Sequence, residues 1–437
     1  MAVQPAASVS DDEPASDGFQ FPGAWYTQST PVFLSGNEAA LLRGGDELFP
    51  AMVRAIEQAL HEVWLATYIF HDDPASEAVA KALIAAARRG VRVRVVVDGF
   101  GSSHSLTTVK RWFGDKGVDL AVFRPLTRWW NWLQPGQLRR LHQKLCVVDG
   151  TRAFVGGINV IDDRNDLHHG FSDAPRLDFA VALHGPVVAP IEQTVRAVWT
   201  RATFGRDWRK ETLQLARSAE PVRAARKLLR RMHLLPATPP PLADDTPVVA
   251  AFVVRDNLRQ RRTIERCMID AIRMANVRVQ LVTPYFYPGR SFRRALIKAA
   301  RRGVQVRLLL QGKLDYRLAG LAARVMYDEL LTAGVEVYEY IPAFLHAKAA
   351  VADDEWATVG SSNVDPLSLL LNLEANIVVR NTGFAAALSE ELDQAMAVSS
   401  RILVAPLRTG LGAMLGRGLV AWLAHWYLRL AGSSEKY

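Results

Sequence analysis

Two segments of the chain repeat one pattern of hydrophobic and polar positions. IAAARRGVRVRVVVDG (Ile84 to Gly99) and IKAARRGVQVRLLLQG (Ile297 to Gly312) are identical at ten of sixteen positions. Each starts as the end of an amphipathic helix, reaches a glycine that stops the helix, and continues as a run of mostly β-branched or leucine residues. Each segment therefore predicts a helix followed by a buried strand.

The same order of elements extends to both sides of each segment. FPAMVRAIEQALHEVWLATYIF and TIERCMIDAIRMANVRVQLVTPYF lie upstream, and the short strands VDLAVF and VEVYEY lie downstream. The repeated order helix–strand–helix–strand predicts an α/β fold. We predict two duplicated domains, each a mixed β-sheet flanked by helices. Their period of about 210 residues is too long for a solenoid repeat.

Changes in composition set the expected domain boundaries. The N-terminal stretch has no basic start and no apolar run, so it does not resemble a secretory signal and is predicted to be disordered. The middle of the chain joins a basic amphipathic helix, VRAARKLLRRMHLL, to a proline-rich linker, PATPPPLADDTP. The predicted parts are a tail at 1–33, a first domain at 34–205, the helix and linker at 206–246, a second domain at 247–400, and a basic amphipathic tail at 401–437.

A short polar phrase is also present twice. In LHQKLCVVDG and FLHAKAAVADD a lysine follows a histidine by two residues, and an aspartate follows that lysine by five; an asparagine completes each copy. The first copy comprises His142, Lys144, Asp149 and Asn159, and the second comprises His346, Lys348, Asp353 and Asn363. Residues i and i+2 of a strand point to the same side, so each copy aims an imidazole and an ammonium group into one space.

This combination of side chains fits displacement at a phosphodiester. One imidazole can attack the phosphorus while another protonates the departing oxygen, whereas a single histidine cannot do both. Lysine and asparagine suit the non-bridging oxygens and stabilise the charge of the transition state. We therefore predict one active site at the interface of the two domains. No metal and no other cofactor is expected, because the nearby carboxylates lack the spacing of a ligand set.

The charge of the chain favours anionic partners. A net charge of +9 suits either nucleic acid or acidic lipid headgroups and does not separate the two. Cys146 lies in an apolar run and Cys267 in a helical pattern, which predicts two buried free thiols in a reducing compartment.

Tryptophans and arginines cluster in two places. Trp129, Trp130 and Trp132 precede the first histidine, and Trp422 and Trp426 lie in the C-terminal tail. Both compositions are typical of a surface that contacts an anionic membrane, with the rings at the headgroup level. The alternatives are a helix packed over the mouth of the active site, a C-terminal helix packed on the core, and a nucleic-acid surface on which tryptophan stacks.

The doubled phrase HxKx4Dx6G[GS]xN resembles the signature of the phospholipase D superfamily, over about residues 35 to 400. The stretches GSSNVDPLSLLLNLEANIVV and PYFYPG further resemble bacterial cardiolipin synthases, of the short type without N-terminal transmembrane helices. This resemblance implies that His142 is the nucleophile and forms a phosphatidyl-histidine. It also implies that His346 is the general acid, and then the base that activates the acceptor alcohol.

The resemblance implies roles for the other motif residues as well. The groups that would bind phosphate are Lys144, Lys348, Asn159 and Asn363. The acids that would each orient the histidine of the opposite half are Asp178 and Glu374. Asp149 and Asp353 belong to the catalytic signature, and the resemblance implies a structural role for them. The chain departs from the family after the first asparagine, where it reads VIDDRND instead of Asp-Glu-Tyr, which bears on the choice of acceptor.

The expected function is a metal-independent phosphatidyltransferase that forms cardiolipin from phosphatidylglycerol and a second phospholipid. The protein is expected at the cytoplasmic face of the bacterial cell membrane, bound peripherally to the anionic surface. Three alternatives stay open: hydrolysis of phospholipids at the same site, a phosphodiesterase acting on nucleic acid, and a basic membrane scaffold without activity. Nucleic acid ranks below lipid because the family's nucleases are often single-motif chains that dimerise, whereas this chain carries both motifs.

Overall fold

The computed structural model describes residues 30–125, 139–167, 170–204, 248–256, 260–312, 327–364 and 372–403. The elements of the first half are β1 (Leu34–Arg43), α1 (Gly44–Glu57), β2 (Glu62–Thr67), α2 (Pro74–Arg88), β3 (Arg92–Asp98), α3 (Leu106–Phe113), β4 (Val118–Phe123), β5 (Arg140–Leu141), β6 (Leu145–Val148), β7 (Arg152–Gly156), β8 (Asn165–Asp166), β9 (Gly170–Phe171), β10 (Phe179–His184) and α4 (Val188–Phe204).

The second half repeats this order with few changes. Its elements are β11 (Val248–Arg255), α7 (Thr263–Met274), β12 (Arg278–Thr283), α8 (Arg290–Arg301), β13 (Gln305–Gln311), α10 (Tyr327–Thr332), β14 (Glu336–Tyr340), β15 (Ala349–Ala352), β16 (Trp356–Gly360), β17 (Asn372–Arg380), α12 (Thr382–Ala397) and β18 (Ser400–Ile402). The helices and strands predicted around the two repeated segments are present in both halves.

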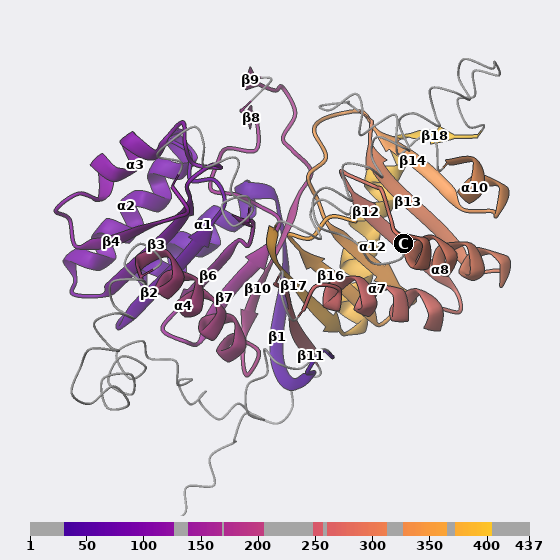
Figure 1. Cartoon of the computed structure of the whole chain (residues 1–437), viewed down its shortest axis with the longest axis horizontal. Coiled ribbons are helices and arrows are strands. Elements are labelled where there is room, and N and C mark those ends of the chain that lie inside the picture. Colours follow the sequence, from indigo (N-terminus) through magenta and orange to yellow (C-terminus); the bar gives the residue numbers. More distant parts are fainter. Residues whose placement is uncertain are drawn as a thin grey trace, which may run out of the picture.

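The strands of both halves form a single mixed sheet (Figure 1). Sixteen described strands belong to it, in the order β18-β14-β13-β12-β15-β16-β17-β11-β1-β10-β7-β6-β2-β3-β4, with β5 attached to β17. In each half three neighbouring strands run parallel, β2-β3-β4 and β12-β13-β14. The other neighbours in this order pair antiparallel, and the attached β5 pairs parallel with β17. The sequence predicted one sheet per domain; the two sheets are instead joined at the centre, where β1 pairs antiparallel with β11.

The shared ARRG stretch ends a helix in the same way in both halves. Gly90 and Gly303 follow α2 and α8 with φ of 91° and 93°, which is a conformation that glycine adopts without the steric cost of a Cβ. The preceding arginine, Arg89 or Arg302, donates to the last carbonyl groups of α1 or α7. This explains why the stretch is so similar in the two halves: it fixes two helix ends at once.

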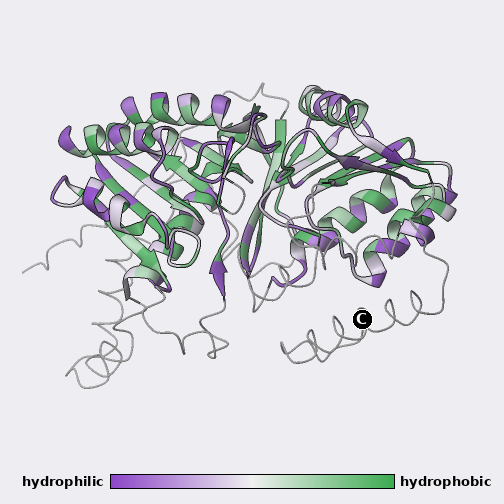
Figure 2. Ribbon diagram, turned by 90° about the horizontal axis from the view of Figure 1, so that it is seen from above, coloured by the Kyte–Doolittle hydropathy of each residue, from purple (hydrophilic) through white to green (hydrophobic). Residues whose placement is uncertain are grey.

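Helices cover both faces of the sheet because its central strands are buried on both sides. In β2 the side chains alternate: Val63 and Leu65 pack under α1 and α2, while Trp64 and Ala66 face α4. A second outer core lies beneath α7, α8 and α10. Figure 2 shows the resulting distribution, with mostly hydrophobic strands at the centre and hydrophilic turns on the helices.

The third core crosses the joint between the halves. It contains Val181 and Leu141 of the first half together with Val254, Leu345 and Leu373 of the second. The fold class predicted from the sequence, a duplicated α/β fold with mixed sheets and flanking helices, is confirmed. Within the described residues, no helix is long and apolar enough to cross a membrane.

Candidate active site

Both copies of the polar phrase lie at the start of equivalent strands. His142 and Lys144 immediately precede β6, and His346 and Lys348 immediately precede β15. Each strand then turns back in a hairpin, β6–β7 or β15–β16. The return strands end at Gly156 and Gly360, so the two motif asparagines follow at the same edge of the sheet.

Backbone hydrogen bonds between the halves bring the two edges together. The amide of His142 donates to the carbonyl oxygen of Leu373 at 3.0 Å, beside the parallel pairing of β5 with β17. The amide of His346 donates to the carbonyl oxygen of Leu177 at 2.9 Å. Each histidine is therefore attached to the stretch that carries the acidic residue of the other half.

The two imidazole rings face each other across the joint. Their centroids are 6.4 Å apart and their planes are inclined by 63°. Nδ1 of His142 lies 2.8 Å from Glu374 Oε2, and Nδ1 of His346 lies 2.6 Å from Asp178 Oδ2. An ionised carboxylate can only accept, so each Nδ1 carries the proton and each Nε2 presents a lone pair. One such nitrogen on either side of a phosphorus atom is the arrangement that an in-line displacement needs.

The two lysines are buried next to their histidines. Each ammonium group donates back to the carbonyl oxygen two residues earlier, Lys144 to His142 at 2.7 Å and Lys348 to His346. Both side chains are almost completely buried. Burial reduces the screening of charge by water, so an anion entering between the two lysines would gain strong electrostatic stabilisation.

The asparagines differ in their present contacts. Asn159 is buried, and its Oδ1 accepts the amide proton of Ile69 at 3.2 Å. Asn363 Oδ1 is buried and has no hydrogen-bond partner among the residues that the structure describes. This oxygen can accept a hydrogen bond from a hydroxyl group, and the amide nitrogen of either side chain can donate one to a phosphate oxygen.

Burial dominates the protonation of the site. It lowers the pKa of His142 to about 4 and that of His346 to about 3, although the partner carboxylates oppose the change. Burial also lowers the pKa of Lys144 to about 7. For Glu374 the nearby His142 and Arg255 outweigh burial, so that the pKa of Glu374 falls to about 2. At neutral pH the imidazoles are therefore neutral and Glu374 is ionised.

The aspartates of the signature lie at the far ends of the same strands. Asp149 accepts the backbone amides of residues 60 to 62, and Asp353 accepts those of residues 276 to 278. Five residues separate Lys144 from Asp149, which corresponds to roughly 16 Å along an extended strand. The structure thus does not bring Asp149 or Asp353 to the imidazoles, and grouping them with the catalytic residues is corrected: they fix loops.

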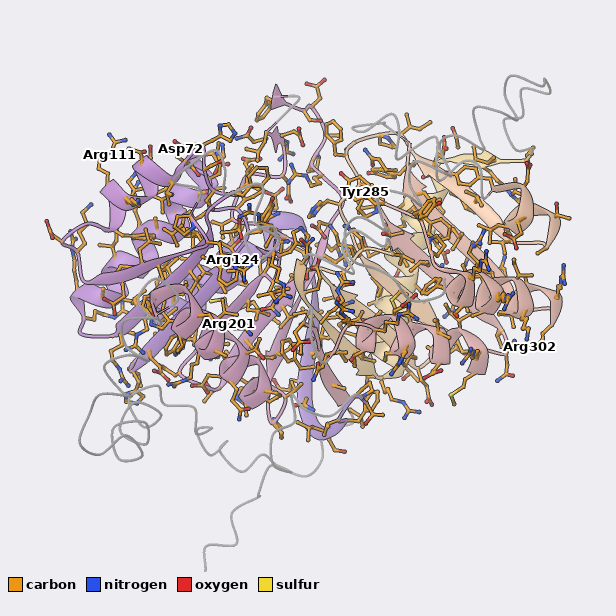
Figure 3. The ribbon with its side chains drawn as sticks, viewed as in Figure 1. Asp72, Arg111, Arg124, Arg201, Tyr285 and Arg302 are labelled. Carbon is orange, nitrogen blue, oxygen red and sulfur yellow. The ribbon has the colours of Figure 1, made fainter. Side chains whose placement is uncertain are left out.

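Two residues beside the motif, Tyr68 and Arg255, were missed by the sequence analysis. The ring of Tyr68 stands edge-on to His142 at 5.1 Å, and the ammonium group of Lys144 lies 5.6 Å from the Tyr68 centroid. Tyr285 of the second half, which occupies the position equivalent to Ile69, lies near the central joint in Figure 3. A tyrosine within two residues of the end of each of these equivalent strands was the available signal. Arg255, which contacts Glu374, carries no signal of this kind. Ser361 also contacts Glu374, and it occupies the variable position of the repeated motif.

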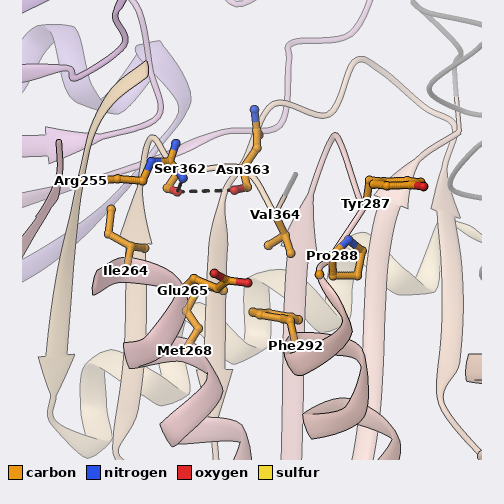
Figure 4. A pocket seen from close by; sticks show the side chains of 11 residues that line it. Arg255, Ile264, Glu265, Met268, Tyr287, Pro288, Phe292, Ser362, Asn363 and Val364 are labelled. Carbon is orange, nitrogen blue, oxygen red and sulfur yellow. Dashed lines mark hydrogen bonds between the residues drawn. The ribbon is translucent and has the colours of Figure 1, made fainter. Parts of the chain in front are cut away.

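A hollow opens beside the site in the second half (Figure 4). Its empty space is about 310 Å³, part of it open to solvent. Arg255, Ser362 and Asn363 line its upper side, and Phe292 and Met268 lie beneath them. The hollow therefore connects the motif asparagine of the second half with an apolar wall.

Some predicted residues lie outside the described part of the chain. These are Trp129, Trp130, Trp132, Trp422 and Trp426, together with most of the predicted tails and linker. Their membrane contacts remain predictions. Within the described ranges, histidine, cysteine and carboxylate side chains do not gather in groups of three or more that could hold a metal ion.

Comparisons with known proteins agree with the geometry. The family profile described as "Cardiolipin synthase, PLD-like domain" matches residues 52–169 and 268–396. Cardiolipin synthase B of Salmonella typhi is 36% identical over 357 residues, which cover 82% of this chain and 80% of that protein. Cardiolipin synthase A of Pseudomonas putida is 32% identical over 371 residues, covering 84% and 70%.

A solved structure shows the same fold. Phosphatidylserine synthase of Haemophilus influenzae superposes with a TM-score of 0.60 at 13% identity, covering 92% of this chain and 96% of that one. The low identity limits this likeness to the architecture.

Proposed function

This chain belongs to the phospholipase D-like family of cardiolipin synthases, and from that membership we propose that it forms cardiolipin by transferring a phosphatidyl group from phosphatidylglycerol to a second phospholipid. The observation that carries the proposal is the pair of imidazoles 6.4 Å apart, each bonded through Nδ1 to a carboxylate of the opposite half. Two presented Nε2 atoms fit a double displacement at one phosphorus.

In the first step, Nε2 of His142 attacks the phosphorus of the donor phosphatidylglycerol. The bond from phosphorus to the glycerol oxygen breaks, and the proton on Nε2 of His346 passes to that oxygen, so that free glycerol leaves. The product is a phosphatidyl group bound covalently to His142. The bound phosphodiester anion favours the charged form of a nearby imidazole, which allows His346 to hold the proton that it needs as an acid.

In the second step, the roles reverse. Nε2 of His346 accepts the proton of a hydroxyl group on the glycerol of a second phosphatidylglycerol. The alkoxide oxygen attacks the phosphorus, and the bond to His142 breaks, which yields cardiolipin and the free enzyme. Through both steps Lys144, Lys348, Asn159 and Asn363 would hold the non-bridging oxygens, where their charges and N–H groups stabilise the transition state.

The position at the membrane forms part of the proposal. The basic chain, with a net charge of +9, is attracted to a surface of anionic phospholipids. We place it peripherally on the cytoplasmic face of the bacterial membrane, with the two tryptophan clusters as contacts. The proposal also includes independence from metal ions, because the paired imidazoles supply the nucleophile and the acid by themselves.

The direct test uses purified protein and phosphatidylglycerol vesicles in the presence of EDTA. Cardiolipin and glycerol are expected in equal amounts, and His142→Ala is expected to abolish both. His346→Ala lacks the acid for glycerol release, so it is given a phosphatidyl ester of p-nitrophenol, whose leaving group needs no proton; the adduct should then form, persist and map by mass spectrometry to His142. His104→Ala, a change at an exposed histidine of the first half, is the matched control and should retain full activity. Equal cardiolipin formation by His142→Ala would refute the proposal.

The same experiment separates transfer from hydrolysis. Water and an alcohol compete for one covalent intermediate, so phosphatidic acid is the product to measure beside cardiolipin. A phosphatidic acid yield that far exceeds cardiolipin, and that added glycerol does not reduce, would identify a phospholipase instead.

A further inference from the structure

The two histidine–carboxylate pairs are not equivalent. In the first half, Arg43 of β1 pairs with Phe179, the residue after Asp178. In the second half, Val254 of β11 pairs with Ala375, the residue after Glu374. The next position along each strand is therefore Gly44 in the first half and Arg255 in the second. The duplication has placed an arginine next to one acidic residue and a glycine next to the other.

Arg255 binds Glu374 inside the protein. Its side chain is 1% exposed and that of Glu374 is 0% exposed, and Arg255 Nη2 lies 3.3 Å from Glu374 Oε1. Nη1 donates to Ser362 Oγ at 3.1 Å, which fixes the plane of the guanidinium group. At Gly44, in contrast, an added Cβ would lie 2.6 Å from Asp163 Oδ2, so this position has no room for a side chain.

A second difference between the two pairs is that Glu374 accepts more hydrogen bonds from side chains than Asp178 does. Ser361 Oγ donates to Glu374 Oε2 at 2.5 Å, the same oxygen that His142 uses, and Asn372 donates to Oε1 at 3.1 Å. The motif residue that matches Ser361 in the first half is Gly157, which has no side-chain hydroxyl to donate. Asp178 accepts from His346 and from the amide of Phe179.

These contacts change what each carboxylate offers its histidine. A carboxylate that shares its charge with a guanidinium group and two further donors is a weaker acceptor, so it stabilises an imidazolium partner less. Other charged groups act on both rings. Lys348 is a cationic neighbour of both histidines, and Lys144 adds to this at His142. Near His346 the additional cation is Arg176, but its guanidinium group is directed to Asp166 and to the carbonyl oxygen of Asn165.

Resting on the proposed function, we propose that Arg255 is a positioning residue that keeps His142 unprotonated and free to attack when the phosphodiester anion enters the site. The anion favours protonation of both imidazoles, and an acid–base pair works only if one of them stays neutral. Arg255 opposes protonation on the His142 side through Glu374. Asp178 has glycines at the two matching positions, so this opposition through the carboxylate is absent on the His346 side, where burial and Lys348 are what lower the pKa of the imidazole.

The test isolates the attack by His142 from the acid. A phosphatidyl ester of p-nitrophenol needs no protonation of its leaving group, so the rate of p-nitrophenolate release against pH reports the neutral fraction of His142. For Arg255→Met, the acid limb of this profile is expected to shift upward by about one pH unit, the size of effect typical for a charge removed near an ionisable group. Arg255→Lys keeps the charge and is expected to retain the wild-type midpoint.

Ser361→Gly gives the second copy the residue of the first and removes one neutral donor. It is expected to shift the midpoint in the same direction by a smaller amount, and it decides the question if Arg255→Met does not fold. A uniform loss of rate at every pH, with the midpoint unchanged in the variants that fold, would show that Arg255 only supports the structure and would overturn the inference. Failure of the proposed function is distinguishable, because it appears as absence of cardiolipin from phosphatidylglycerol while p-nitrophenolate is still released.

Discussion

Replacing Asp149 by alanine is expected to destabilise the protein while leaving the chemistry of the folded molecule intact. The carboxylate accepts three backbone amides, those of Leu60, His61 and Glu62, each at 2.8 Å. It also occupies a left-handed backbone conformation, with φ of 52°. Alanine loses all three hydrogen bonds and tolerates this conformation poorly, whereas asparagine keeps one acceptor oxygen and adopts the conformation readily.

The size of the effect follows from these contacts. A hydrogen bond to a charged acceptor contributes about 1.5–3 kcal/mol when buried, but two of the three here are exposed to solvent. We therefore expect about 2 kcal/mol from the three bonds together, and about 1 kcal/mol more from alanine in the left-handed region. Asp149→Ala should lower the free energy of unfolding by about 3 kcal/mol, and Asp149→Asn by about half of that.

Urea unfolding measures the stability, and the initial rate of cardiolipin formation at a low temperature, where each variant is folded, measures the chemistry. Asp353 offers a matched pair of substitutions, because it holds residues 276 to 278 in the same way. A thousand-fold loss of rate in Asp149→Asn with unchanged stability would refute the reasoning and return Asp149 to the catalytic group.

Three further predictions follow from the site and the sequence. Acid should destabilise the protein, because the pKa of His142 is lowered to about 4 and that of His346 to about 3 in the folded state. The unfolded chain therefore binds more protons than the folded one between pH 6.5 and those values. A urea midpoint that does not fall from pH 7 to pH 5 would contradict this. Gly157→Ala should inactivate the enzyme, because the new Cβ would lie 2.2 Å from Asp178 Oδ1 and displace the partner of His346. Turnover equal to that of the wild type would show that Asp178 tolerates a side chain at position 157. Deleting residues 410–437 should weaken binding to anionic vesicles and leave the unfolding midpoint unchanged, and flotation equal to that of the full chain would count against a membrane role for this tail.

Much of the site could be predicted because its signals are local. The spacing of His142, Lys144 and Asn159 lies within one hairpin, and the second copy repeats it. The sequence also predicted that the two copies meet, since one histidine cannot serve as nucleophile and acid together. The resemblance to a known family supplied Asp178 and Glu374, and both contact the histidine of the opposite half.

Other features depend on contacts between distant parts of the chain. The pairing of β1 with β11 joins residues more than two hundred positions apart, and the sequence of neither strand indicates which strand it pairs with. Arg255 is the last residue of an apolar strand, and an arginine in that position ordinarily predicts a strand end exposed to solvent. Only the register of β11 on β17 brings it to Glu374. Asp149 and Asp353 were grouped with the catalytic residues through the signature, although the resemblance implied a structural role, and their backbone contacts agree with that structural role.

The central joint imposes an order on turnover. One hydrophobic core crosses it, with Val181 and Leu345 in the same cluster, and the imidazoles on its two sides have their centroids 6.4 Å apart. In the proposed mechanism the departing glycerol and the incoming lipid hydroxyl both need Nε2 of His346, and one nitrogen cannot serve them together. The first alcohol therefore has to leave before the second binds, which predicts a ping-pong order of turnover.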